Sequence, residues 1–369
     1  MKEYLFILGR DHELSILEII AYFEKNKLNY SMKGFTVSAA VIAIDGEFDS
    51  VISIKQLGGI VKIGEIISDV RDYIYEGTDN KVKFGVSPYE VEDISDIEQE
   101  IKSMFKEQKL KGIYKKTKRE GGPLMPNEVI KQKLVEEGVE FLVYRNYLAK
   151  TLAAFNPFDH EKRDEQMPCK DYLKTISIRL AKILINLSQA KKTLLDPFCG
   201  YGVILQEGML MGLDVKGIDQ DKTSIDSAKT NLRFIEKKYN LKVSYKVIHG
   251  DSTQLSKIIQ NADAIATEPF LGPYIKEMPT IQEAQKTMAK LEPMYDAVIK
   301  EAKKVVKGKI AIVVPRFPTI QNVEVVMRFS QIIKKYGYKP WRPIELIGMP
   351  VIYPHGRIVR EIWVIEPET

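Results

Sequence analysis

The sequence predicts an α/β protein with a doubly wound parallel sheet in its C-terminal part and a mixed α+β region before it. From residue 176 onward, short apolar runs of strand character alternate with longer runs of helical periodicity. This alternation is typical of a parallel sheet with helices on both faces. The 369 residues also exceed the usual size of a single hydrophobic core, so we expect two domains.

In the C-terminal part the pattern begins with a helix and continues through a strand, a glycine turn, a second helix and a second strand. The expected elements are helices 176–187 and 204–211 and strands 193–195 and 215–218. Further strands are expected at 243–248, 262–266, 310–314 and 362–365. Residues 353–357, followed by Arg360, predict a hairpin turn before the last of these strands.

The N-terminal part shows strand-like runs at 4–8, 38–44 and 81–86 and helical periodicity at 14–25, 96–109 and 127–137. Gly121-Gly122-Pro123 interrupts the chain before the last helix. A second break lies around Asn156-Pro157. We therefore expect one domain over 1–155 and another over 156–369.

The composition excludes several classes of protein. It is 44% hydrophobic and 28% charged, as in ordinary soluble globular proteins. Two cysteines, Cys169 and Cys199, are too few for a disulfide framework or a zinc site. No apolar run is long enough for a transmembrane helix. We expect a cytoplasmic protein whose chemistry needs no metal.

Positive charge is concentrated in one segment. Ten basic and three acidic residues lie between Lys102 and Lys133, and such an excess suits the phosphate backbone of a nucleic acid. Its densest part predicts an RNA-binding set, namely Lys115, Lys116, Lys118 and Arg119.

The sharpest motif runs from Leu194 to Gly202, where an apolar strand ends in Asp196 and a turn with Gly200 and Gly202 opens a helix. Ligands of doubly wound sheets bind at this place. The turn lacks the third glycine of the dinucleotide fingerprint, and Asp196 would repel a pyrophosphate but suits an ammonium group. Phe198, inside the same turn, joins the expected ligand-binding set.

Two later strands also end in acids. Asp219 follows the second strand and is placed to accept hydrogen bonds from ribose hydroxyls. Asp251, followed by Ser252, ends the third strand, where an acid can receive an adenine amino group. An ammonium, a ribose and an adenine together describe S-adenosyl-L-methionine. The alternatives are a nicotinamide or other nucleotide site, and helix N-caps or solvated loops for the single acids.

The fourth strand ends in Glu268-Pro269-Phe270-Leu271, which resembles the Asp/Asn-Pro-Pro-Tyr/Phe motif of amino methyltransferases. The resemblance implies that Glu268 and the Pro269 carbonyl accept hydrogen bonds from a target amine while Phe270 contacts an extruded base. The match has departures: Glu replaces Asp or Asn, Phe270 occupies the second proline position, and Leu271 occupies the aromatic one. Glu268 as a loop cap, or as the partner of a lysine, is the alternative.

Over its whole length the chain resembles the archaeal and eukaryotic tRNA guanine-N2 methyltransferases of the position-10 type. The shared features include the opening residues 4–15, Gln56-Leu57-Gly58-Gly59, Lys162-Arg163-Asp164 and the 196–202 motif. The resemblance implies a Rossmann-type class I methyltransferase domain after an N-terminal α+β region containing a tRNA-binding THUMP domain. The implied product is N2-methylguanosine or its dimethyl form, with tRNA position 10 as the target.

Other functions stay open at this point. The cofactor and acceptor motifs also fit an amino methyltransferase acting on DNA or on another RNA, and the unusual 268–271 motif admits a non-catalytic RNA-binding homologue. Eukaryotic members of the family work with a small activating subunit, so the resemblance adds such a partner to the expectations. The sequence leaves the oligomeric state open.

Overall fold

The structure, a computed structural model, describes residues 1–119, 121–171, 175–354 and 356–368. The chain forms two compact units, and helix α1 (His12–Asn26) is divided between them. The first unit comprises Met1–Ile16 and Asn26–Glu165, and the second comprises Leu17–Lys25 and the chain from Gln166 onward. The boundary expected after residue 155 falls ten residues before this division, ahead of helix α5 (Pro157–Glu165).

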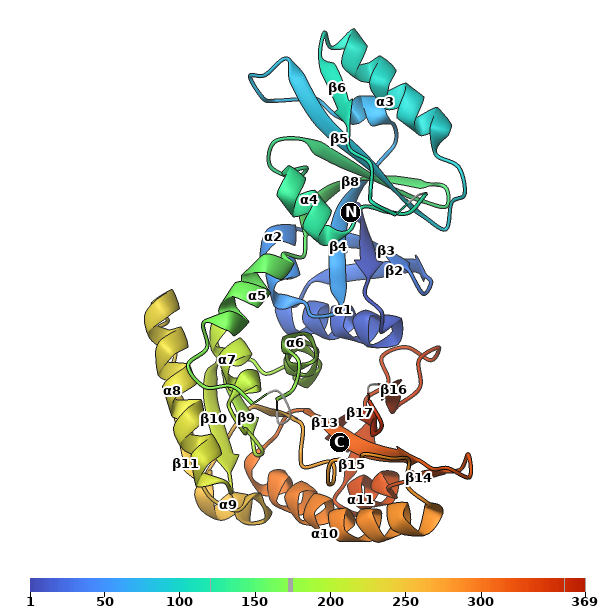
Figure 1. The fold of residues 1–369 in the computed structure, drawn as a ribbon. Helices are drawn as coiled ribbons and strands as arrows, with labels where there is room; N and C mark the ends of the chain where they lie inside the picture. Colours follow the sequence, from blue (N-terminus) through green and yellow to red (C-terminus); the bar gives the residue numbers. More distant parts are fainter. Residues whose placement is uncertain (120, 172–174, 355, 369) are drawn as a thin grey trace. The chain divides into compact units, whose positions relative to one another are not determined.

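The first unit is built on one eight-stranded sheet in the order β2-β3-β1-β4-β8-β7-β5-β6 (Figure 1). Its pairs are antiparallel except those of β5 with β6 and with β7, which are parallel. The strands are β1 (Lys2–Leu8), β2 (Asn29–Phe35), β3 (Ala39–Asp45), β4 (Ile60–Ile67), β5 (Lys81–Tyr89), β6 (Lys111–Tyr114), β7 (Val139–Tyr144) and β8 (Tyr147–Ala154). The other helices are α2 (Ser50–Gln56), η1 (Val70–Asp72), α3 (Ser95–Glu107) and α4 (Pro126–Gln132).

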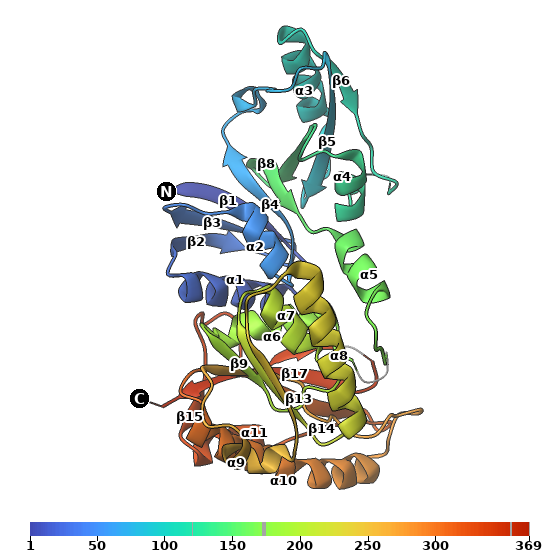
Figure 2. The same cartoon turned by 90° about the vertical axis from the view of Figure 1, so that its left-hand side faces the viewer.

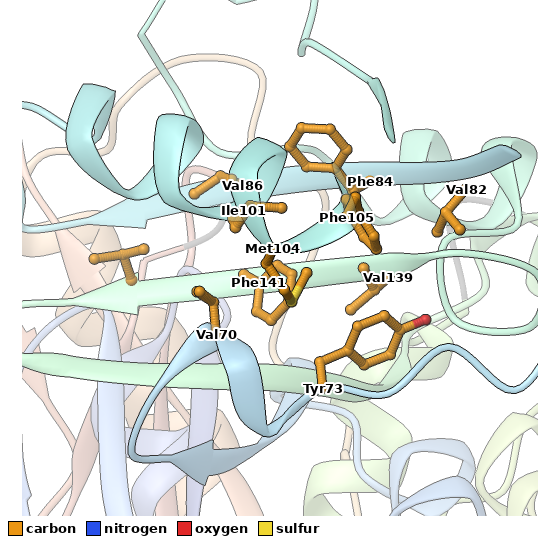
Figure 3. Packing of buried hydrophobic residues seen from close by; sticks show 11 residues of the cluster. Val70, Tyr73, Val82, Phe84, Val86, Ile101, Met104, Phe105, Val139 and Phe141 are labelled. Atoms are coloured by element: carbon orange, nitrogen blue, oxygen red, sulfur yellow. The ribbon is translucent and has the colours of Figure 1, made fainter. Parts of the chain in front are cut away.

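Helix α3 confirms the amphipathic pattern expected at 96–109. It buries Ile101, Met104 and Phe105, and these pack against Phe84 of β5 and Phe141 of β7 in one apolar cluster (Figure 3). Burial of such side chains contributes roughly 1.5–3 kcal/mol each. The cluster therefore holds α3 against the end of the sheet that carries the basic segment.

Helix α4 is shorter than the expected helix at 127–137. It ends at Gln132, because Lys133 adopts a left-handed conformation with φ of 55° and its N–H bonds back to Ile130. The residues from Lys133 to Glu137 form turns. A left-handed residue at the end of a helix stops its propagation, and periodicity alone did not reveal it.

A charged pair is buried between β4 and β7. The side chains of Lys62 and Glu140 are fully inaccessible and form an ion pair, and Lys62 also donates to the Leu124 carbonyl at 2.7 Å. Ser87 and Thr151 donate to Glu140. Burial lowers the pKa of Lys62, and the charge of Glu140 opposes that change. The pair fixes Leu124, the residue after the glycine break, to the sheet.

The second unit is built on a nine-stranded sheet with the main order β11-β10-β9-β12-β13-β17-β15. Its first five strands run parallel, and β17 is antiparallel to β13. The strands are β9 (Thr193–Asp196), β10 (Asp214–Asp219), β11 (Tyr245–His249), β12 (Ala264–Thr267), β13 (Ile310–Pro318), β14 (Glu324–Val326), β15 (Tyr338–Pro340), β16 (Val351–Tyr353) and β17 (Val359–Pro367). The doubly wound parallel sheet is confirmed.

Helices cover both faces of this sheet. Figures 1 and 2 show α6 and α7 on one side and α9, α10 and α11 on the other. The helices are α6 (Ile178–Ser188), α7 (Val203–Leu210), α8 (Lys222–Tyr239), η2 (Ser252–Gln254), α9 (Leu255–Ile258), α10 (Ile281–Val305) and α11 (Phe329–Lys335). The expected hairpin is present as the antiparallel pair β16–β17, although His355 lies outside the described residues. Among the helices the structure describes, none is long and apolar enough to cross a membrane.

We predict that Lys62→Met lowers the free energy of unfolding by about 3–5 kcal/mol, because Glu140 is left as a buried charge without its cation. Lys2→Met, which removes an exposed ion pair with Glu65, should cost less than about 1 kcal/mol. Urea denaturation of the full-length variants, followed by circular dichroism, measures both changes. Equal losses in the two variants would contradict the prediction.

Candidate active site

A pocket opens in the second unit at the carboxyl ends of the parallel strands. Its walls come from the end of β9, the turn after it, the start of α7, the segment before α6 and the residue after β12. The lining residues are Thr175, Ile176, Asp196, Phe198, Cys199, Gly200, Tyr201, Val203, Ile204 and Glu268. Four predicted site residues, Asp196, Phe198, Gly200 and Glu268, thus share one pocket. The space inside it, open solvent included, is ≈ 320 Å³.

Asp196 is a buried carboxylate with one free oxygen. Its side chain accepts hydrogen bonds from Thr267 Oγ1 at 2.6 Å and from the Phe198 N–H at 3.0 Å, both at Oδ1. Among the described residues no donor reaches Oδ2. Burial raises the pKa of Asp196 to about 7, the two hydrogen bonds oppose that rise, and the charges of Asp219 and Glu268 add to it. A carboxylate in this setting favours a cationic ligand.

The turn after β9 is tied to the next strand by Asp219. The Gly200 N–H donates to Asp219 Oδ2 at 2.9 Å, and the Asp221 N–H donates to Oδ1 at 2.8 Å. Each oxygen keeps a lone pair for a further donor. Gly202 caps α7 with φ of 84°, and a Cβ there would lie 3.3 Å from the Ala228 Cβ. Glycine is therefore needed at this position for its conformation and for the approach of α8.

The third acid lies apart from the pocket walls. Asp251 is exposed and caps η2 by accepting from the Thr253 N–H at 2.9 Å. Ser252 is buried, and its hydroxyl donates to the Pro197 carbonyl, which fastens this loop to the turn after β9. Asp251 thus has the N-cap role that the sequence left as an alternative, with carboxylate lone pairs to spare.

Glu268 stands at the end of β12 and forms an ion pair with Arg360 of β17. This basic partner lies 92 residues away in the sequence. Pro269 is buried, whereas Phe270 is 57% exposed and Tyr274, later in the same loop, is 76% exposed. The loop therefore presents one acid inside the pocket and two aromatic rings to solvent.

Sequence reasoning missed several features of the site. Asn231 of α8 is buried and joins two loops, since its amide exchanges hydrogen bonds with the backbone of Cys169 and donates to the Tyr201 carbonyl at 3.1 Å. These contacts hold Cys169 and the glycine turn to the same side chain of α8. An asparagine inside an amphipathic helix gives no sign of such a role.

The basic segment of the first unit follows β6. Lys116, Lys118 and Arg119 are exposed, and Lys115 is half-buried. Glu128 at the start of α4 holds this loop, because its carboxylate accepts from the Lys118 N–H at 3.0 Å and from Thr117 Oγ1 at 3.2 Å. The loop backbone is thus fixed while three of its cationic side chains face solvent.

Comparisons with known proteins agree with this geometry. The model of the family UPF0020, described as an RMKL-like methyltransferase domain, matches residues 170–339. The chain is 33% identical to the tRNA (guanine(10)-N2)-dimethyltransferase of Pyrococcus abyssi over 162 residues, which are 43% of this chain and 44% of that protein. It is 37% identical over 103 residues to the enzyme of the same name from Methanothermobacter thermautotrophicus, covering 27% of this chain and 29% of the relative.

These matches span less than half of each relative's own length. Among solved structures, TrmN from Thermus thermophilus resembles the chain with a TM-score of 0.52 at 13% identity, covering 99% of both chains. This likeness supports the fold. Residues 170–339 of the second unit are thus similar to the RMKL-like methyltransferase domain, and part of the chain is similar in sequence to enzymes named tRNA (guanine(10)-N2)-dimethyltransferase.

Proposed function

We propose that the protein transfers a methyl group from S-adenosylmethionine to the N2 amine of a guanine in tRNA, with position 10 as the target. The observation that carries the proposal is the meeting of Asp196 and Glu268 in one pocket at the strand ends. The first suits a cationic methyl donor, and the second suits an amine that must lose a proton. The names of the related enzymes point to tRNA and to this position. They also point to a dimethylated product.

The pocket fits the cofactor in charge and in free hydrogen-bonding groups. Oδ2 of Asp196, which no donor among the described residues reaches, is the proposed acceptor for the ammonium group, and the Asp219 carboxylate is the proposed acceptor for ribose hydroxyls. Asp251 and Ser252 are proposed to line the site of the adenine. Phe198, Gly200 and Gly202 form the turn that lets the backbone approach closely. When bound, S-adenosylmethionine supplies an electrophilic methyl group on a sulfonium.

Glu268 and the Pro269 carbonyl hold the target amine. An exocyclic amine is a poor nucleophile because its lone pair is delocalised into the ring, so two acceptors are needed to turn that lone pair toward the methyl carbon. With the cofactor bound, its sulfonium would supply the methyl group to the amine that these two acceptors hold. Glu268, or water beside it, would take up the proton that the nitrogen loses. Phe270, exposed beside the acceptors, contacts the extruded base.

The first unit is proposed as the tRNA-binding region, a THUMP domain with its basic segment on the phosphate backbone. DNA remains the competing substrate, since phosphate contacts do not distinguish the two nucleic acids, but the related enzymes are named for tRNA. A small activating subunit belongs to the same proposal. The free thiols of Cys169 and Cys199 suit a cytoplasmic location.

We predict that affinity for S-adenosylmethionine rises between pH 6 and pH 7.5. Asp196 is partly protonated in this range because burial holds its pKa at about 7, and the cationic ligand favours the ionised form. Binding must therefore expel a proton below pH 7, at a cost of at most about tenfold in affinity per pH unit. Calorimetric titration measures the trend. In Asp196→Asn the affinity should be weaker and independent of pH, and a flat profile in the unaltered protein would refute the ammonium assignment.

We predict opposite effects for substitutions of Glu268, which lines the pocket, and of Asp219, which holds the glycine turn of the pocket. Glu268→Ala should reduce kcat by roughly 100-fold or more, as loss of a general base does, while the Kd for S-adenosylmethionine stays unchanged. Asp219→Ala should first weaken cofactor binding. Transfer of labelled methyl to unmodified tRNA transcripts gives kcat, and calorimetry gives Kd. Loss of cofactor affinity in Glu268→Ala would make it a structural residue, and unchanged affinity in Asp219→Ala would remove it from the ribose site.

We predict that replacing Lys115, Lys116, Lys118 and Arg119 by Gln weakens tRNA binding and flattens its salt dependence. For each cationic side chain that neutralises a phosphate, its replacement should reduce the slope of log K against log salt by up to about 0.9. A matched variant replaces four exposed lysines of the second unit, Lys222, Lys229, Lys237 and Lys242. Filter binding at several salt concentrations compares them, and equal slopes in the two variants would exclude the segment from the interface.

A further inference from the structure

The ion pair between Glu268 and Arg360 joins the end of β12 to the start of β17 in the sheet of the second unit. Strand β13 lies between β12 and β17, and Arg360 stands opposite Pro315 of β13. The Arg360 side chain therefore reaches across the end of β13 to meet Glu268 beyond the last residue of β12. The two side chains are only 20% and 15% exposed, so solvent screens their attraction less than at an open surface.

The geometry of this pair leaves most of the carboxylate available. Arg360 donates through Nε to Oε1 of Glu268. Within the part of the chain that the structure describes, no other hydrogen-bond donor reaches Glu268. Oε2 and the second lone pair of Oε1 can therefore accept from a ligand. A carboxylate only accepts hydrogen bonds, so both of its oxygens suit donors on a ligand.

Glu361, the residue after Arg360 on β17, forms its ion pair on the opposite face of the sheet. Glu361 pairs with Arg316 of β13 at 2.8 Å and accepts from the Trp363 indole at 2.9 Å. Successive residues of a strand point to opposite faces of the sheet. Arg360 therefore serves the side of the sheet edge that holds Glu268, while Glu361 and Arg316 form a separate pair on the other side.

Two adjacent acceptor oxygens match one base edge. Guanine presents two neighbouring donors, the ring N1–H and the N2 amine, along its Watson–Crick edge. Adenine and cytosine each present their amine beside a ring nitrogen that carries a lone pair, and a carboxylate oxygen would repel that lone pair. A buried polar group that a wrong base leaves unpaired or repels is energetically costly, so such a site discriminates strongly against the wrong base.

We propose that Arg360 is a positioning residue that holds Glu268 as a two-oxygen acceptor for the N1–H and N2–H of guanine, so that this pair selects the base that is methylated. The inference rests on the proposed function and adds to it how the base is chosen. One carboxylate oxygen accepts from N1–H, and the other accepts from the amine and turns its lone pair toward the methyl group. Glu268 in place of Asp or Asn supplies the extra reach that this contact and the Arg360 contact need together.

The test replaces the methylated guanosine of a tRNA transcript by 2-aminopurine ribonucleoside, which keeps the amine but has a ring lone pair in place of N1–H. The unaltered full-length protein should lose roughly 10- to 100-fold in kcat/KM on this substrate. Glu268→Gln has one donor and one acceptor, which match 2-aminopurine. This variant should prefer 2-aminopurine or treat the two bases alike.

Arg360 is tested with the same substrates. Arg360→Ala should lower kcat about tenfold or more and weaken the preference for guanine, while KM for tRNA and the Kd for S-adenosylmethionine change little. Arg360→Lys, which keeps the charge, should recover part of the loss. Arg316→Lys is the matched control, because Arg316 is similarly exposed at 23% and pairs with Glu361 on the neighbouring strand. It should leave kcat and the preference unchanged.

The outcomes separate the inference from the function on which it rests. The proposed contact with the N1–H and N2–H of guanine would be overturned if the unaltered protein methylated guanine and 2-aminopurine at equal rates. An unchanged preference in Glu268→Gln would overturn it as well. An unchanged kcat in Arg360→Ala would overturn the positioning role. Transfer to no guanine at all would overturn the proposed function, and the inference with it.

Discussion

The burial of Asp196 at the end of β9 is the constraint on which the rest of the site depends. Water is excluded from this carboxylate, and the bonds from Thr267 and the Phe198 N–H compensate only part of the lost hydration. Both bonds end on Oδ1, and because no donor among the described residues reaches Oδ2, this oxygen is available to the ammonium group proposed for it. A buried carboxylate of this kind lowers the stability of the ligand-free protein and favours the binding of a cation. The strand end is thereby prepared for a charged ligand before any ligand arrives.

The order of the parallel strands explains why the acids converge. Strands β10, β9 and β12 are neighbours, so Asp219, Asp196 and Glu268 follow their carboxyl ends along one edge. Chain order reverses between β9 and β12, and doubly wound sheets bind ligands at such a point. Strand β11 lies one place farther out, which agrees with the position of Asp251 outside the pocket walls. The two acids that line the pocket, Asp196 and Glu268, thus follow the two strands on either side of this reversal.

The sequence was informative wherever the signal was local. The acids and glycines at 196–202 and 219 could be placed because strand ends and turns are determined by residues that are neighbours in the sequence. The amphipathic helix at 96–109 could be found by the helical spacing of its apolar residues. Contacts between distant segments could not be found. The residues next to Glu268 in the sequence do not predict its ion pair with Arg360. Likewise, the residues around Asn231 do not predict its hydrogen bonds to Cys169 and Tyr201. The left-handed Lys133 that ends α4 depends on tertiary context, and short strands such as β14 and β15 are too brief for a period to be detected.

The chemistry follows from these placements. A buried acid suited to a cation, a second acid suited to an amine, and a separate basic segment suited to phosphate describe methyl transfer to a nucleic-acid base. The most direct test is mass spectrometric analysis of the nucleosides from an unmodified tRNA transcript after incubation with the protein and S-adenosylmethionine. The account predicts N2-methylguanosine, followed by its dimethyl form. A methyl group found only on adenine or cytosine, or on no nucleoside while the cofactor still binds, would contradict it.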